Sequence, residues 1–339
     1  MKIPKPRKLP SGKWFVRCMV DGQSYSKTFD TEKEATRWAA GIKTTLIEAE
    51  APTAALTVEK AVDKYIEINS PVWSPSTTLG YKRIKKNMME RILDIRLADL
   101  TQEMIQKWVN SMVKTHSPKS IANAHGLLSA VLRQYKPSMT LRTNLPSKVK
   151  AEIQIPSEAE IKAIVRGCKG TKYELPIMLA VWLGLRKSEI LGLTWDCIKG
   201  DTITIKQAVV MGENGETMKG TKTYSGTRTL HLPAYLKNLI EQQPRTGDRI
   251  VTMSGQAIYK GFTRICEKEG LPAFRFHDLR HTNASVMLAS GVPDKYSMKR
   301  MGHATNNMLK TVYQHTLKER EAVYDQTIDA YFEDMTKPE

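Results

Sequence analysis

Alternating apolar and polar positions near the N-terminus predict a small β-sheet followed by one helix. The segment WFVRCMVDGQSYSKTF alternates on both sides of Asp21-Gly22, a dipeptide typical of tight hairpin turns. Thr31 and Glu34 then have the spacing of a helix-capping box. The apolar residues that follow lie at helical spacing: Ala35, Trp38, Ile42 and Leu46. We therefore expect a three-stranded sheet plus a helix over residues 1–52.

Residues 53–140 show the apolar period of helices in four successive segments. These segments are TVEKAVDKYIEI, SPSTTLGYKRIKKNMMERIL, LTQEMIQKWVNSMV and SPKSIANAHGLLSAVLRQY. The second begins with Ser74 and Pro75, a serine N-cap followed by a proline at the first helical position. We expect a four-helix domain here. Residues 141–155 have no apolar period and predict an extended linker.

Residues 156–317 combine helical and strand patterns, and the chain ends in an amphipathic tail. Ser157 and Glu160 have capping-box spacing, and Gly184 interrupts the apolar helix in LAVWLGLRKSEILGL. The segments TITIKQAVVM and TRTLHL predict a β-meander, and residues 318–339 predict a helix. The predicted fold is therefore multidomain and mainly α with small β-sheets: a β-sheet-plus-helix domain, a four-helix domain and a mixed α/β domain.

Composition is typical of a globular protein and argues against several other classes. The length of 339 residues suffices for two or three domains. No apolar run approaches the roughly 20 residues that span a bilayer, and the basic N-terminus, MKIPKPRKLPSG, lacks the apolar core of a secretory signal. We therefore expect a cytoplasmic protein without a membrane partner. The four cysteines form no CxxC pair, which argues against a disulfide framework or a zinc knuckle.

The formal net charge of +17 indicates a polyanionic partner, because cationic surfaces bind nucleic acid through the release of counterions. Residues 51–155 carry sixteen Lys and Arg against eight Asp and Glu, whereas the tail carries three against seven. The candidate DNA contacts lie on the exposed face of the predicted N-terminal sheet, since a β-ribbon can enter the major groove, and in a basic N-terminal arm and on a basic helix. The basic residues of the arm and the helix are Lys2, Lys5, Arg7, Lys8, Lys13, Lys82, Arg83, Lys85 and Lys86. A solvated helix face would have the same pattern, so the helix alone does not decide between the two.

The segment FRFHDLRHTNAS places three candidate functional side chains within five residues. His277 and His281, four apart on a helix, have the spacing of two metal ligands, whereas His277 and Arg280, three apart, suit a phosphate. The HExxH zinc motif requires a glutamate directly after the first histidine, and Asp278 stands there instead. The chain also has no phosphate-binding loop of the G-x-x-x-x-G-K-[ST] type. We therefore favour a phosphate and expect neither a metal nor another cofactor.

Five further polar residues are ambiguous one at a time. Arg186 lies among apolar residues, where a guanidinium needs either an anion or a carboxylate, and a local pair with Glu189 would satisfy it equally well. Lys222 lies near a predicted turn and could be an ordinary solvated lysine. His303 follows a glycine, and Tyr313, ten residues later, is one of twelve tyrosines.

Taken together, these motifs resemble the tyrosine recombinase (phage integrase) family. The matching segments, in order, are GLRKSEIL, TKT…R, HDLRH, MGH and VYQH. All six signature positions are present at compatible spacings, and a small departure is Met301, where leucine is common. The two preceding domains are similar to the arm-binding and core-binding domains of integrases by pattern only. The resemblance thus implies the integrase type, with an N-terminal arm-binding domain and a mixed α/β catalytic domain.

The resemblance implies that three of these residues contact the scissile phosphate of DNA and that a fourth has a structural role. Arg186 and Arg280 would bind its two non-bridging oxygens, and His303 would donate a hydrogen bond to it. Glu189 would be the structural acid beside the first arginine. Two guanidiniums can stabilise a phosphoryl-transfer transition state in the way that metal ions do elsewhere.

The resemblance also implies one nucleophile and two proton-transfer residues. Tyr313 would attack the phosphorus and form a 3′-phosphotyrosine link, His277 would accept the phenolic proton, and Lys222 would protonate the leaving 5′ oxygen. A tyrosine is mostly protonated at neutral pH, so it needs such a base. The covalent ester keeps the phosphodiester energy, so the reaction requires no ATP.

The implied function is site-specific recombination for a phage or transposon in a bacterial host. A homotetramer would cut and rejoin two DNA duplexes through a Holliday junction, at core and arm attachment sites. The implied accessory partners are an excisionase and a host DNA-bending protein, and the active protein would be associated with the nucleoid. The acidic tail would dock either on a neighbouring subunit or on its own domain.

Two other functions fit part of the pattern. A type IB topoisomerase-like enzyme uses the same chemistry on one duplex, but the separate N-terminal DNA module favours a recombinase. A catalytically idle DNA-binding regulator would explain the charge, but not a complete set of catalytic positions.

Overall fold

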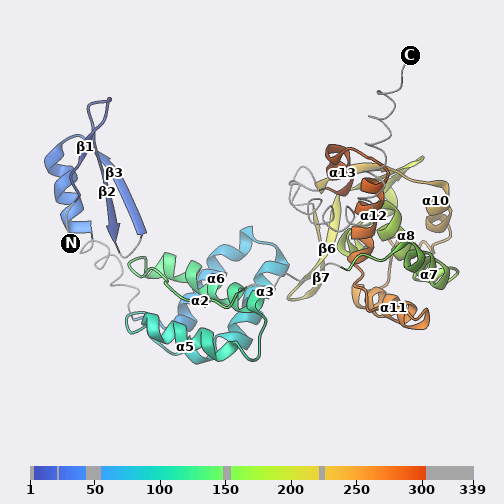
Figure 1. Cartoon of the computed structure of the whole chain (residues 1–339), viewed down its shortest axis with the longest axis horizontal. Coiled ribbons are helices and arrows are strands. Elements are labelled where there is room, and N and C mark those ends of the chain that lie inside the picture. Colours follow the sequence, from blue (N-terminus) through green and yellow to red (C-terminus); the bar gives the residue numbers. More distant parts are fainter. Residues whose placement is uncertain (1–3, 21–22, 43–54, 148–153, 221–225, 303–339) are drawn as a thin grey trace, which may run out of the picture. The chain divides into compact units, whose positions relative to one another are not determined.

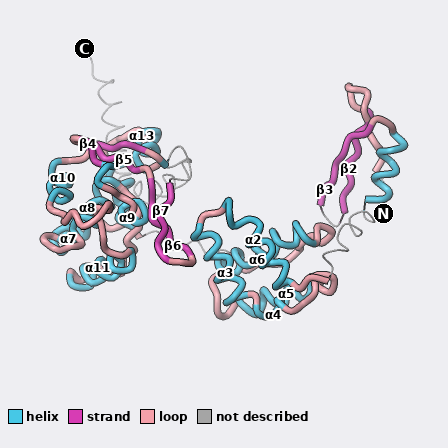
Figure 2. Tube along the Cα trace, turned by 180° about the vertical axis from the view of Figure 1, so that it is seen from behind, coloured by secondary structure: helices cyan, strands magenta, loops and turns pink. Residues whose placement is uncertain are grey.

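In the computed structural model, the described residues are 4–20, 23–42, 55–147, 154–220 and 226–302. The chain divides into two compact units, residues 1–150 and 151–339, and helices predominate over short strands (Figures 1 and 2). The prediction of a multidomain, mainly helical protein with small sheets is confirmed. Some predictions fall outside the described residues, namely those for Lys2, Lys222, His303, Tyr313 and the tail, residues 318–339.

The N-terminal sheet forms because one face of a hairpin is apolar. Its strands are β1 (Arg7–Lys8), β2 (Trp14–Val20) and β3 (Gln23–Phe29), antiparallel in the order β1-β2-β3. The expected hairpin is therefore present. Val16 and Cys18, alternate residues of β2, are buried against a helix over residues 32–42. Thr31 and Glu34 exchange the two hydrogen bonds of a capping box at the start of this helix.

The helical part of the first unit packs around one large aromatic side chain. Its helices are α2 (Val58–Asn69), α3 (Pro75–Met88), α4 (Glu90–Leu93), α5 (Gln102–Met112) and α6 (Pro118–Tyr135), with a 3₁₀ turn η1 (Ser70–Val72). Trp108 is buried in this core, and its indole N–H donates to the carbonyl of Met88 at 2.6 Å. Ser74 is the N-cap of α3 as predicted, but its hydroxyl contacts the Ser76 hydroxyl instead of the backbone.

The second unit is a larger core of helices and short strands. Its helices are α7 (Glu158–Cys168), α8 (Glu174–Leu183), α9 (Lys187–Leu191), α10 (Ala234–Glu241), α11 (Gly255–Lys268), α12 (Asp278–Ala289) and α13 (Asp294–Met301), with a 3₁₀ turn η2 (Trp195–Cys197). Helix α8 is apolar almost all round and packs against α12 (Figure 1). Among the described residues, no helix is both long and apolar enough to cross a membrane.

The strand region of the second unit corrects the prediction of a simple meander. Its strands are β4 (Ile198–Lys199), β5 (Thr202–Ile205), β6 (Gln207–Gly212), β7 (Gly215–Gly220) and β8 (Arg228–His231). Strand β5 pairs with both β4 and β8, while β6 and β7 form a separate hairpin. Burial explains the difference: Ile203, Ile205 and Leu230 face the core, so β5 and β8 pair directly.

Candidate active site

A break between α8 and α9 sets Arg186 at the start of a helix. Gly184 ends α8 with φ 64°, and a Cβ at this position would lie 2.7 Å from Oδ1 of Asn283. Glycine meets both demands, because it adopts the left-handed conformation readily and has no Cβ. Arg186 follows in extended conformation as the N-cap of α9. The predicted helix interruption is confirmed, and it carries Arg186 out of the apolar helix.

Glu189 is a buried carboxylate that receives hydrogen bonds from two arginines. Its side chain is 4% exposed. Its Oε2 accepts from the backbone N–H of Arg186 at 2.9 Å, and its Oε1 accepts from the guanidinium of Arg186 at 2.7 Å. Arg228 provides the second guanidinium, with bonds of 2.9 Å to Oε2 and 3.2 Å to Oε1. The local Arg186–Glu189 pair considered above exists, but it is only part of a larger network.

Arg228 is the arginine of the TKT…R segment, and its contact with Glu189 was not predicted from the sequence. Its side chain is 2% exposed, and its Nε donates to the carbonyl of Arg300 at 2.7 Å. The strand alternation contained a signal, because Arg228 shares the inward face of β8 with Leu230. A charged residue at an inward position requires a buried partner of opposite charge. Glu189 is that partner.

Arg280 is the third guanidinium of the cluster, and it is buried. Its side chain is 1% exposed, and one of its nitrogens lies 4.0 Å from Oε2 of Glu189. It also donates to the backbone carbonyls of Gly184 and Met301. Helix α12 therefore places Arg280 between the end of α8 and the end of α13.

The charged side chains of this cluster strongly shift one another's pKa values. Burial alone would raise the pKa of Glu189, but the hydrogen bonds and charge of Arg228, together with Arg186, outweigh it and lower the pKa to about 2. Burial and the nearby Arg186 lower the pKa of Arg280 to about 9. The carboxylate is thus ionised at pH 7, and the cluster keeps a net positive charge suited to an anion.

His277 and His281 lie beside the arginines, and their rings meet edge to face with centroids 5.1 Å apart. Partial burial, the nearby His281 and the charges of Arg280 and Arg186 lower the pKa of His277 to about 4. His277 is exposed to solvent. His277 is neutral at pH 7 and can accept a proton. Among the described residues, no group of three or more His, Cys, Asp and Glu side chains could hold a metal ion.

The structure therefore brings together four of the predicted site residues. Arg186, Glu189, His277 and Arg280 come from α9 and the start of α12, and Arg228 completes the cluster. About a third of the Arg186 side chain is exposed, so this arginine and His277 form the accessible edge of the cluster. The described residues end at Gly302. Its carbonyl oxygen lies 3.5 Å from a guanidinium nitrogen of Arg186.

The predicted DNA contacts differ in how exposed they are to solvent. Exposed basic side chains include Lys5, Arg7, Lys8, Lys13, Lys82, Arg83 and Lys86. Lys13 pairs with Asp30 at 3.2 Å but stays 57% exposed. Lys85 is different, because its ammonium forms ion pairs with both Glu59 at 3.0 Å and Asp63 at 2.7 Å, and its side chain is only 18% exposed. Helix packing in the first unit therefore occupies Lys85, which is a weaker candidate for DNA contact than its neighbours.

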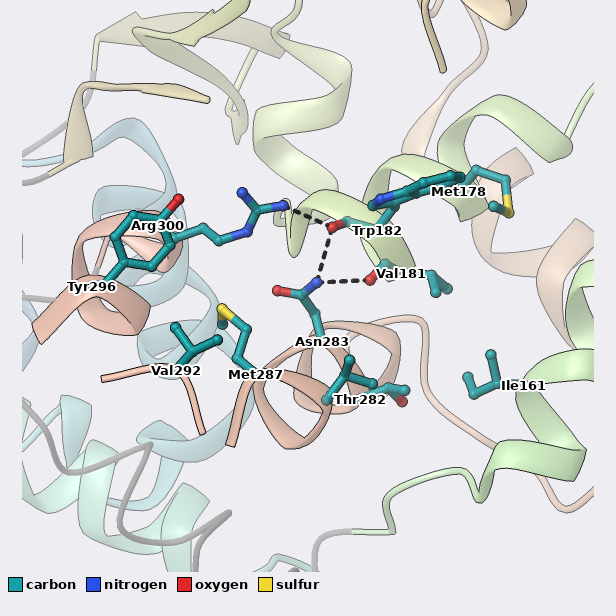
Figure 3. Close-up of a pocket in the computed structure, with 11 residues that line it drawn as sticks. Ile161, Met178, Val181, Trp182, Thr282, Asn283, Met287, Val292, Tyr296 and Arg300 are labelled. Carbon is teal, nitrogen blue, oxygen red and sulfur yellow. Dashed lines mark hydrogen bonds between the residues drawn. The ribbon is translucent and has the colours of Figure 1, made fainter. Parts of the chain in front are cut away.

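A separate apolar cavity of about 420 Å³ lies between α8, α12 and α13 (Figure 3). Its lining includes Met178, Val181, Trp182, Val286, Met287 and Tyr296. At its edge the amide of Asn283 donates to the carbonyls of Val181 and Trp182, and Arg300 donates to the Trp182 carbonyl at 3.2 Å. These donors satisfy the last carbonyls of α8. The cavity itself remains mostly hydrophobic.

Comparisons with protein-family models match both units. Residues 156–320 match the phage integrase family, and residues 57–113 match the phage integrase N-terminal SAM-like domain. An integrase of Mycobacterium phage D29 is 25% identical over 326 residues, covering 85% of this chain and 86% of that protein. A XerC-like tyrosine recombinase of Caldanaerobacter subterraneus subsp. tengcongensis is 26% identical over 219 residues, and the match spans 55% of this chain and 56% of that protein.

Solved structures share the fold at lower identity. The integrase of the transposon Tn1549, in complex with transposon right-end DNA, superposes with a TM-score of 0.64 at 19% identity, covering 79% of this chain and 100% of that one. A lambda integrase tetramer bound to a Holliday junction gives a TM-score of 0.58 at 18% identity, covering 89% of this chain and 96% of that one.

Replacing the buried carboxylate tests the charge cluster. We expect Glu189→Gln to lower the free energy of unfolding of the second unit by about 3–5 kcal/mol at pH 7, because three guanidiniums lose their counter-charge. The folded pKa lies below the ordinary value, so the ionised carboxylate stabilises fully above pH 4.5 and loses this effect as the pH falls toward 2. Urea denaturation at pH 7, 4 and 3 should therefore show that the difference in free energy of unfolding between variant and wild type becomes smaller as the pH falls.

Glu158→Gln is the matched control. Glu158 forms an exposed pair with Lys162, so Glu158→Gln should leave the free energy of unfolding close to that of wild type. If the difference in free energy of unfolding between Glu189→Gln and wild type stayed constant across this pH range, the stabilising role of the ionised Glu189 would be contradicted.

Proposed function

The chain belongs to the phage integrase family of tyrosine recombinases, and we propose that it is a site-specific DNA recombinase that acts through a 3′-phosphotyrosine intermediate. The observation that carries the proposal is the cluster of Arg186 and Arg280 around Glu189, with His277 at its edge. Guanidiniums aimed at one point suit the non-bridging oxygens of a phosphodiester. The formal charge of +17 supports DNA as the source of that phosphodiester.

The proposed reaction exchanges one phosphate ester for another. The phenol oxygen of Tyr313 attacks the phosphorus, the bond to the 5′ oxygen breaks, and the 3′ phosphate stays linked to the tyrosine. The phenolic proton passes to His277, whose lowered pKa keeps it neutral and ready. Lys222 donates a proton to the departing 5′ oxygen, and His303 donates a hydrogen bond to the phosphate. A 5′ hydroxyl from the second duplex then reverses the steps and joins the new strand.

Phosphate binding requires a change at Arg280. Its guanidinium is buried and donates to the carbonyls of Gly184 and Met301, whereas Arg186 is partly exposed. A phosphate would therefore meet Arg186 and His277 first. Arg280 would reach the phosphate by exchanging a backbone carbonyl for a phosphate oxygen, which is the better acceptor because it carries charge.

We propose that successive domains of the chain have different functions and that each has its own hydrophobic core. Residues 1–52 would bind arm sites, residues 53–140 would bind core sites, residues 141–155 would link them to a catalytic domain over 156–317, and residues 318–339 would form a tail helix. Two of the buried clusters support this division, one centred on Val16 and the other on Trp108. A homotetramer that forms a Holliday junction would be the active assembly, helped by an excisionase and a host DNA-bending protein.

The topoisomerase-like alternative uses the same cluster and differs in its product. Relaxation of a supercoiled plasmid without any recombinant product would favour it. A DNA-binding regulator would not require a neutral His277 beside two arginines. It would bind DNA without forming a covalent link. Both alternatives are therefore separated from a recombinase by the DNA products.

Replacing the proposed nucleophile tests the chemistry. Nicked duplexes of random sequence would be incubated with the protein, and those captured covalently would be sequenced and used as substrates. We expect Tyr313→Phe to abolish the covalent adduct while leaving DNA affinity unchanged, because only the attacking oxygen is lost. Tyr259→Phe, at an exposed position on α11, is the matched control and should capture as wild type does. An adduct that survives in Tyr313→Phe would sink this assignment.

The outer face of the N-terminal sheet has the chemistry of a DNA-binding surface. Phe15, Arg17 and Met19 alternate with the buried residues of β2, and Met19 is 54% exposed. The guanidinium of Arg7 lies 5.8 Å from the centre of the Phe15 ring, and Arg17 donates to the Ser24 hydroxyl at 2.5 Å. This face offers cations and hydroxyls on a β-ribbon, which can enter a major groove. Arg17 and Met19 were not among the contacts expected from the sequence.

Removing one cation from this face should weaken DNA binding in a salt-dependent way. We expect Arg17→Ala to lower the affinity for duplex DNA and to reduce the slope of log affinity against log salt by about one. The control is Arg37→Ala, which removes the same charge from the exposed side of the helix behind the sheet. Equal losses in both variants, measured by fluorescence anisotropy, would mean that net charge acts and that the sheet face does not.

The acidic tail and the apolar cavity form a candidate subunit contact. The tail carries three basic and seven acidic residues with apolar residues at helical spacing, and the cavity is rimmed by Arg300. We propose that the tail of one subunit docks into this cavity of its neighbour on DNA. Val286, which lines the cavity and is 57% exposed, would be covered by that contact.

Tail removal and a cavity variant should therefore have the same effect on assembly. We expect deletion of residues 318–339, and separately Val286→Glu, to reduce tetramers on a captured duplex in favour of smaller complexes, as measured by light scattering. Val113→Glu introduces the same charge at a similarly exposed valine of the first unit and should leave tetramers intact. Tetramers that persist after tail deletion would exclude docking in trans.

A further inference from the structure

Three arginines donate to three consecutive backbone carbonyls at the end of α13. Arg228 donates to the carbonyl of Arg300 at 2.7 Å, Arg280 donates to that of Met301, and Arg186 reaches that of Gly302 at 3.5 Å. These carbonyls lie at the C-terminal end of a helix, where they lack partners within the helix and the macrodipole is negative. The end of α13 is thus held by the same cluster that surrounds Glu189.

Arg228 is the member of this set that is best placed to support the others. Its side chain lies on β8 and is 2% exposed, whereas the Arg186 side chain is 35% exposed. One part of its guanidinium binds both oxygens of Glu189, and its Nε binds the α13 carbonyl. A planar guanidinium can make these bonds together, whereas a lysine ammonium has no such fork.

Glu189 in turn orients the arginine that would meet the phosphate. The Glu189 oxygen that accepts from the Arg186 guanidinium also accepts from Arg228 at 3.2 Å. Without Arg228, the carboxylate could rotate, and burial would raise its pKa with less opposition. Arg186 would then lose its fixed partner, and the end of α13, immediately before His303, would lose one of its three anchors.

We propose that Arg228 is a positioning residue for phosphoryl transfer: it fixes the Glu189 carboxylate that orients Arg186 and anchors the end of α13 that leads to His303. Arg228 does not touch the DNA in this scheme. The inference rests on the proposed recombinase function, because it assigns a role in that reaction.

The rate of covalent capture, compared with DNA affinity, tests the proposal. On a duplex captured by the wild-type full chain, Arg228→Gln should slow adduct formation about 10- to 100-fold, the range found when a residue that orients a metal-binding side chain is lost. DNA affinity should stay unchanged. Arg249→Gln removes an arginine that pairs with Glu216 at 3.0 Å elsewhere in the same unit, and it should change neither quantity. A wild-type rate in Arg228→Gln would overturn the proposal.

The pH profile separates positioning from a merely structural role. In Arg228→Gln, Glu189 should titrate at a higher pH than in wild type, because among the described residues its remaining cationic neighbours are Arg186 and Arg280. Adduct formation should therefore acquire a new acidic limb, which Glu189→Gln in the same chain should remove. A rate lowered equally at every pH would overturn the proposal. If Arg228→Gln does not fold, Arg228→Lys keeps the charge and loses the fork, and a wild-type rate in that variant would also overturn it.

Orthovanadate, a mimic of five-coordinate phosphorus, distinguishes this proposal from the proposed function. Vanadate should raise the Tm of wild type and of Arg249→Gln, and raise that of Arg228→Gln less. If wild type forms no adduct on any duplex but the vanadate shift still depends on Arg228, the recombinase proposal fails and the positioning role stands. If adducts form and Arg228→Gln matches wild type in both assays, the positioning role alone fails.

Discussion

One buried carboxylate constrains the whole second unit. Glu189 is shielded from water, and its charge is acceptable only because guanidiniums from three separate elements surround it: Arg186 before α9, Arg228 on β8 and Arg280 on α12. Each of these elements must therefore arrive at one point. The break at Gly184, the direct pairing of β5 with β8 and the packing of α12 on α8 all serve that convergence.

The members of the same cluster differ in how accessible their side chains are. Arg228 and Arg280 are buried and donate to backbone carbonyls, while Arg186 and His277 form the edge that a ligand can reach. The exposed cations of the first unit are suited to binding a polyanion. Contacts with the phosphates of DNA position the duplex but do not cleave it. The basic first unit is therefore suited to DNA affinity. The hydrogen-bonded arginine cluster of the second unit is suited to chemistry on DNA.

Much of the fold could be predicted because local signals agree with the packing. The alternation around the hairpin, the capping box at Thr31 and the break at Gly184 are each set by short-range physics. Pairing between β5 and β8 was missed, since two strands separated by a hairpin are joined by burial of Ile203 and Leu230 and by no local motif. For the site, the family motifs indicated Arg186, His277 and Arg280. Arg228 is the arginine of the TKT…R segment, but its place in the cluster could not be recognised, because it depends on which distant carboxylate its strand faces.

The most direct measurement is a crystal structure of the full chain on a captured nicked duplex with vanadate at the nick. The account predicts that the guanidiniums of Arg186 and Arg280 contact the vanadate oxygens and that the phenol oxygen of Tyr313, from the same or a neighbouring subunit, lies in line with the 5′ oxygen. A phenol that cannot enter the cluster, or a divalent ion bound between His277 and His281, would contradict it.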